Sequence, residues 1–178
     1  MKTFDLAEVR DFAAALGARM DRCDNGEGME CSSLDDTLRH YAALCCEFHD
    51  GVRQWGQAVF SGRTPFNPDV ERVLKAEAER LYTRAVATLA YGQSAEASCY
   101  SLDGQDALRS ALWDLYLLLD NWVTPKLAVG PAARLRPVLD PAEVEDARRR
   151  IEALPSLPAD WQPGDLGQQK IYRKLKSS

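Results

Sequence analysis

Residues 34–59 have the sequence LDDTLRHYAALCCEFHDGVRQWGQAV, in which apolar side chains recur at alternating steps of four and three residues. The apolar positions are Leu34, Leu38, Tyr41, Cys45, Phe48, Val52, Trp55 and Val59. This spacing places all of them on one face of an α-helix. Ser32 or Ser33 can cap the start of that helix, and Asp35 and Asp36 fall in its first turn. The pattern predicts a helix over 33–61 whose apolar face packs against other helices.

Two glycines interrupt this helix. Gly51 and Gly56 lie just off its apolar face, and each costs about 1 kcal/mol of helix propensity. Two explanations are open: a neighbouring backbone approaches closely at these positions, or the helix simply tolerates them.

Further segments have the same helical spacing and extend the prediction to the whole chain. They predict helices over 4–24, 68–91 and 102–124, with a short fifth helix over 141–154. Asn67 followed by Pro68 is a typical helix start, an N-cap followed by proline at the first helical position. Short connections require consecutive helices to run antiparallel. We therefore predict an all-α fold, an antiparallel four-helix bundle over residues 1–130, and no sheet.

The composition changes after this bundle. Six prolines fall between Pro131 and Pro163. We expect residues 131–178 to belong to the same domain and to form a Pro-rich wrap with the short fifth helix and a basic tail.

The helix predicted over 102–124 is apolar on two sides. Leu112, Leu115 and Leu119 lie on the first side, which we expect to face the core. The second side carries Trp113, Tyr116 and Leu117. This second side is either a surface for another molecule or is covered by the Pro-rich wrap, with Trp161 as the anchor.

The charge of the chain is unevenly distributed. The protein has 178 residues and a net charge of −5. Residues 168–178 carry four basic side chains, Lys170, Arg173, Lys174 and Lys176, and no acidic one, so the remaining residues sum to −9 (−5 minus +4). An acidic body disfavours non-specific coating of nucleic acid, which depends on many Lys and Arg contacts to phosphate. The short basic tail is either a docking arm for an acidic partner, for nucleic acid or for the protein's own acidic body, or it is a solvated terminus.

The cysteine count bears on the location of the protein. The chain has five cysteines and no apolar run near the length of a membrane span. The first residues lead directly into an acidic amphipathic stretch, from which we expect no signal peptide. We therefore expect a cytoplasmic protein with free thiols, in which Cys23 and Cys45 pack as small apolar side chains. Cys23 and Cys31 flank the first turn closely enough for a disulfide, but a reducing cytosol disfavours one.

The segment Cys45-Cys46-x-x-His49 is the one cluster that resembles a reactive or metal site. On a helix His49 lies one turn from both cysteines, and an imidazole beside a thiol can lower the thiol pKa and create a nucleophile. Zinc would require four ligands, and His40 lies more than one turn from the cluster. Cys46 and His49 are therefore the catalytic candidates, and we expect no metal and no cofactor.

Several catalytic sites are excluded by the sequence. The chain has only two histidines and no Glu-x-x-His pair for a di-iron centre. It also lacks a C-x-x-C-H haem attachment motif and a phosphate-binding loop. These absences favour a protein that is not an enzyme.

Three functional hypotheses follow. The first is a non-enzymatic protein-interaction module, such as a subunit of an assembly, an immunity protein or antitoxin, or an inhibitor. It would bind another protein or a second copy of itself, and no membrane. Its contact residues would be Trp113, Tyr116, Leu117, Lys170, Tyr172, Arg173, Lys174 and Lys176. The alternatives are a thiol-based redox enzyme or sensor using Cys46 and His49, and a nucleic-acid-binding accessory subunit acting through the basic tail.

Overall fold

The computed structural model describes residues 5–27, 31–94, 102–123 and 141–155. These residues form five helices, α1 (Leu6–Asp24), α2 (Leu34–Phe60), α3 (Pro68–Gly92), α4 (Leu102–Val123) and α5 (Pro141–Glu152). The predicted all-α bundle with a short fifth helix is confirmed, and the predicted helix boundaries agree with the observed ones to within two residues. No helix among the described residues combines the length and the apolar character that crossing a membrane requires.

The helices begin where side chains satisfy the free N–H groups of their first turns. Asp5 caps α1 by accepting a hydrogen bond from the Glu8 N–H at 2.8 Å. Ser33 caps α2 through the Asp36 N–H at 3.1 Å. Asn67 caps α3 and Pro68 follows it, as the sequence predicts.

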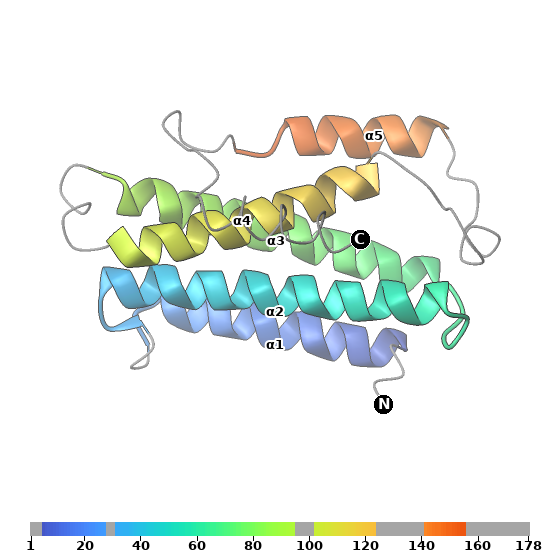
Figure 1. Ribbon diagram of the computed structural model, residues 1–178, viewed down its shortest axis with the longest axis horizontal. Coiled ribbons are helices and arrows are strands. Elements are labelled where there is room, and N and C mark those ends of the chain that lie inside the picture. The colour runs from blue at the N-terminus through green and yellow to red at the C-terminus, as the bar shows by residue number, and fades with distance from the viewer. Residues whose placement is uncertain (1–4, 28–30, 95–101, 124–140, 156–178) are drawn as a thin grey trace, which may run out of the picture.

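Helices that follow one another in the chain run antiparallel, so α2 and α4 run parallel and start at the same end of the bundle. Figure 1 shows α1 and α2 side by side, with α5 lying outside α4 on the far side from them. Arg39 at the start of α2 contacts Asp103 at the start of α4, at 3.4 Å. The Gln105 side chain on α4 donates to the Gly92 carbonyl at the end of α3, at 2.8 Å. These contacts fix α4 against both α2 and α3.

The core consists of the apolar faces that the spacing predicts. On α2, Leu34 is half-buried and the other seven members of the predicted face are buried. The first side of α4 is buried as well, with Leu112 and Leu115 fully enclosed and Leu119 nearly so. Cys45 packs in this core, as expected.

Helices α2 and α4 approach each other closely at Gly104. Its N–H donates to Asp35 Oδ1 at 2.8 Å. A Cβ atom at this position would lie 2.9 Å from Leu38 Cβ and 3.0 Å from the Asp35 carbonyl oxygen. At Gly51 a Cβ would meet only the Phe12 ring, at 3.3 Å, and at Gly56 it would meet nothing within 4 Å. Gly56 is therefore merely tolerated, and the glycine that a close backbone requires is Gly104.

We expect Gly104→Ala and Gly56→Ala to change stability in opposite directions. The methyl group at position 104 would push α4 off α2, and overpacking of this kind costs about 1–3 kcal/mol. At position 56 the methyl group would contact no neighbouring atom, so the gain in helix propensity should stabilise the protein by about 0.5–1 kcal/mol. Urea denaturation of both variants measures the difference. Equal stabilisation by both substitutions would contradict the close approach at Gly104.

Candidate functional site

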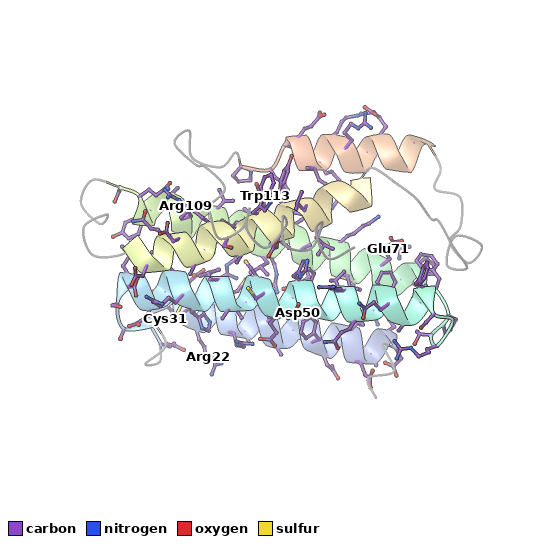
Figure 2. The ribbon with its side chains drawn as sticks, in the orientation of Figure 1. Arg22, Cys31, Asp50, Glu71, Arg109 and Trp113 are labelled. Atoms are coloured by element: carbon purple, nitrogen blue, oxygen red, sulfur yellow. A yellow bond between two sulfur atoms is a disulfide. The ribbon has the colours of Figure 1, made fainter. Side chains whose placement is uncertain are left out.

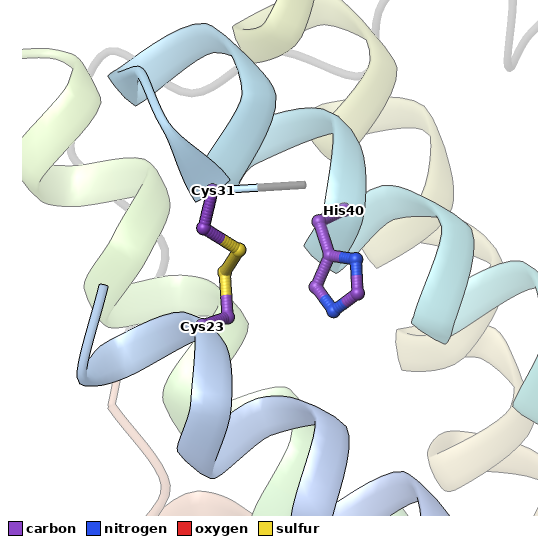
Figure 3. Close-up of side chains that lie close together, drawn as sticks. All are labelled: Cys23, Cys31 and His40. Carbon is purple, nitrogen blue, oxygen red and sulfur yellow. A yellow bond between two sulfur atoms is a disulfide. The ribbon is translucent and has the colours of Figure 1, made fainter. Parts of the chain in front are cut away.

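Cys23, Cys31 and His40 meet at the end of the bundle where α1 turns into α2 (Figure 3). Cys23 lies in the last turn of α1 and is buried, and Cys31 precedes α2 and is half-buried. The two form a disulfide with a Cα–Cα distance of 5.4 Å. His40 lies on α2 and is 9% exposed. One donor atom from each of the three side chains lies within 4.8 Å of the other two.

The expectation of free thiols at Cys23 and Cys31 is wrong. It depended on an inference about the cellular compartment, whereas the geometry of the turn favours the bond. Because α1 and α2 are antiparallel and the turn is short, the two Cα atoms lie within the range that a disulfide spans. Cys23 is still part of the core, as expected, but as one half of this disulfide.

A polar network holds the end of α1 beside α2 and α3 independently of the disulfide. Tyr41 donates its hydroxyl to Asp24 Oδ1 at 2.6 Å. Arg84 on α3 pairs with the same Asp24 carboxylate and, at 2.9 Å, with Asp21. Burial and the hydrogen bond to Asp24 raise the pKa of Tyr41 well above its usual value. Asp24 follows Cys23 in the chain and Tyr41 follows His40, so this network holds together the turns of α1 and α2 that carry the cysteine and the histidine.

His40 was not among the site residues predicted from the sequence. The sequence feature that relates to His40 is the helical register of α2. Ser33, at the start of the helix, and His40 are seven residues apart, which is about two turns, so both lie on one face of the helix. Cys31 precedes Ser33 by two residues. Among the described residues, the group of three potential metal ligands is therefore Cys23, Cys31 and His40 rather than Cys45, Cys46 and His49.

The Cys45-Cys46-x-x-His49 segment places its two thiols in different environments. Cys45 is fully buried, and burial, reinforced by the neighbouring Cys46, raises the pKa of its thiol well above the usual value. Cys46 is exposed. His49 is half-buried, with Nδ1 3.6 Å from Asp50 Oδ1. Of the two thiols, only Cys46 is therefore accessible to a substrate or an oxidant, and its reactivity remains a prediction.

We expect a maleimide to modify Cys46 rapidly in the native protein and to modify Cys45 only after unfolding. Maleimides react with the thiolate, and the raised pKa of Cys45 keeps that thiol protonated at neutral pH. Mass spectrometry of peptides after a short exposure measures both rates. Comparable labelling of the two cysteines in the native state would show that Cys45 is not enclosed.

The second side of α4 has an aromatic pair at its centre. The rings of Trp113 and Tyr116 are stacked, with centroids 5.9 Å apart and an interplanar angle of 22°. Trp113 and Leu117 are half-buried, whereas Tyr116 is 36% exposed. Tyr82 on α3 is buried, and burial, with a contribution from the nearby Tyr116, raises the pKa of Tyr82 to about 12.

Helix α5 covers part of this second side. Figure 2 shows Trp113 on the side of α4 that faces α5. Ile151 and Leu154, from α5 and the residues after it, pack against the core, and Arg150 pairs with Glu79 on α3 at 2.7 Å. Helix α5 therefore lies over part of the second side and leaves Tyr116 exposed. Covering by the Pro-rich wrap with Trp161 as the anchor stays a prediction. The other predicted contact residues, Lys170, Tyr172, Arg173, Lys174 and Lys176, and the anchor Trp161 lie outside the described residues.

Comparisons with known proteins complete the description of the site. No protein-family model matches the chain, and neither a curated protein nor a solved structure matches it. We therefore infer function from the contacts and exposures given above.

Proposed function

We propose that this protein is an interaction module that binds a basic surface of another protein through the outer face of α4 around Trp113 and Tyr116. The observation that carries this proposal is the stacked aromatic pair, whose Tyr116 is exposed on a helix that packs its first side into the core. This function can take several forms: a subunit of an assembly, an immunity protein or antitoxin, or an inhibitor.

The aromatic pair has the properties of an interface centre. Tyrosine and tryptophan are enriched among the residues that contribute most to binding free energy. Stacking on Trp113, which is itself half-buried, restricts the rotamers of Tyr116 before any partner arrives. Binding then costs less side-chain entropy than it would for an exposed, unsupported tyrosine.

The charge of the chain supports a basic partner. Residues 1–167 sum to −9, and such a field accelerates association with a positively charged surface. The same field opposes close approach of a second copy of this chain. Self-association through α4 is therefore the less favoured form of the interaction.

We also propose a cytoplasmic location. Disulfides are rare in cytosolic proteins, and those that occur there are usually transient and respond to the redox state. Cys31 is the less buried of the two bonded cysteines. A bond that opens and closes in the cytosol is compatible with this location.

We expect Tyr116→Ala to lower the affinity for the co-purified partner at least about tenfold, the size of an interface hot spot. Tyr91→Ala is the matched control, because Tyr91 is 66% exposed at the end of α3. Isothermal titration calorimetry with the purified partner measures the affinity of both variants. Raising the salt concentration should weaken the binding of the wild type. Equal affinities for the two variants would refute the α4 surface.

A further inference from the structure

We propose that the reduced protein binds one Zn²⁺ ion through the thiolates of Cys23 and Cys31 and the imidazole of His40. This inference depends on the thiol cluster and not on the α4 surface, so either proposal can fail without the other. It also replaces the expectation of no metal, which was based on Cys45, Cys46 and His49.

The donor set matches the chemistry of zinc. Thiolate sulfur and imidazole nitrogen are the ligands that Zn²⁺ prefers. Bond lengths of about 2.3 Å to sulfur and 2.0–2.1 Å to nitrogen place two sulfur donors and one nitrogen donor roughly 3.5–3.8 Å apart in a tetrahedral site. The three donor atoms already lie within 4.8 Å of one another, so the sulfurs need only separate once their bond is broken. Three protein ligands leave a fourth position for water.

The surroundings keep the donors together after reduction. The hydrogen bond from Tyr41 to Asp24, at 2.6 Å, joins the residue after His40 to the residue after Cys23. Arg84 holds the same carboxylate from α3. Cys23 therefore stays beside His40 when the disulfide opens, and only Cys31, which precedes α2, has to adjust.

The zinc site forms in two stages, reduction of the disulfide and then binding of the ion. A dithiol reductant attacks the half-buried Cys31 sulfur as a thiolate, forms a mixed disulfide and releases Cys23 as a thiolate. The second thiol of the reductant then displaces Cys31, so the reductant leaves as its own disulfide and the protein gains two electrons and two protons. Zn²⁺ next displaces the two thiol protons and binds both sulfurs and the His40 nitrogen. The oxidised protein cannot bind the ion in this way, because the two sulfurs are bonded to each other.

Native mass spectrometry of the full chain tests the proposal. The protein is reduced with dithiothreitol, freed of reductant under nitrogen and titrated with ZnCl₂. We expect one zinc per reduced chain, with the mass change of one zinc minus two protons, and no bound zinc in the oxidised chain. Cys31→Ser and His40→Asn should each weaken binding at least tenfold. Cys46→Ser and His49→Asn are the matched controls and should bind as the wild type does.

A second measurement uses only the wild type, so its result does not depend on whether the substituted variants fold. Zinc should protect Cys23 and Cys31 of the reduced wild type from N-ethylmaleimide and leave the rate at Cys46 unchanged. Three results would overturn the proposal: substoichiometric zinc in the reduced wild type, equal binding by the oxidised protein, or loss of binding in Cys46→Ser or His49→Asn.

Discussion

Phe48→Ala is expected to lower the free energy of unfolding by about 3–5 kcal/mol, the usual cost of removing a buried phenylalanine. Phe48 is 0% exposed at the middle of the α2 face. Its ring stacks on Phe12 of α1, with centroids 6.3 Å apart. The substitution therefore removes contacts to a second helix and leaves a cavity that the surrounding helices cannot close. Leu38→Ala and Leu115→Ala should cost about 2–5 kcal/mol each for the same reason.

Urea denaturation followed by circular dichroism measures this loss. Cys46→Ala is the control on the same helix, since Cys46 is exposed and surface substitutions usually change stability by less than about 0.5 kcal/mol. If Phe48→Ala were as stable as Cys46→Ala, the apolar face of α2 would not be the core of this protein.

Replacing both Cys23 and Cys31 by alanine is expected to destabilise the oxidised protein by about 2–3 kcal/mol. The bond closes a loop with a sequence separation of eight, and the chain-entropy model assigns a crosslink of this span an effect of that size. The bundle should nevertheless stay folded, because Tyr41 and Arg84 continue to hold Asp24.

The redox state provides the internal control for this prediction. Wild type and the double variant are compared by urea denaturation with and without dithiothreitol, and with a chelator present so that metal binding does not contribute. The difference between them should be present without the reductant and should largely disappear with it. Identical stabilities under oxidising conditions would mean that the disulfide does not constrain the unfolded chain.

The fold was predictable because its determinants are local. The steps of four and three along α2 and α4 follow directly from helix geometry, and the caps at Ser33 and Asn67 are short-range hydrogen bonds. The two-sided character of α4 left two outcomes open, a surface for another molecule or covering by the Pro-rich wrap. Helix α5 packs against α4, and which outcome holds at the exposed Tyr116 stays a prediction.

The remaining features depend on contacts between distant residues. The close approach at Gly104 depends on how α2 and α4 are placed, and helical spacing alone carries no information about it. The disulfide depends on the distance between Cys23 and Cys31 across a turn, and composition suggested the opposite outcome. His40 joins those cysteines only because of the register of α2 relative to α1.

The candidate site was predicted in part. The sequence identified Trp113 and Tyr116 as a second apolar side of α4, and the structure stacks their rings. It did not indicate which of the two would stay exposed, because this depends on where α5 lies. The sequence placed Cys45, Cys46 and His49 in one cluster because they are close in the chain, and it did not indicate that burial separates Cys45 from the exposed Cys46. The catalytic role of Cys46 and His49 stays a prediction.

The most direct test of the proposed function is photo-crosslinking from position 116. A benzophenone amino acid is placed at Tyr116 and, as the control, at Tyr91, which is more exposed and lies at the end of α3. Each protein is irradiated with the purified partner, and the crosslinked peptides are identified by mass spectrometry. We predict a crosslink from position 116 to a lysine- and arginine-rich surface of the partner and none from position 91. Efficient crosslinking from position 91 with none from position 116 would contradict the assignment of α4 as the binding surface.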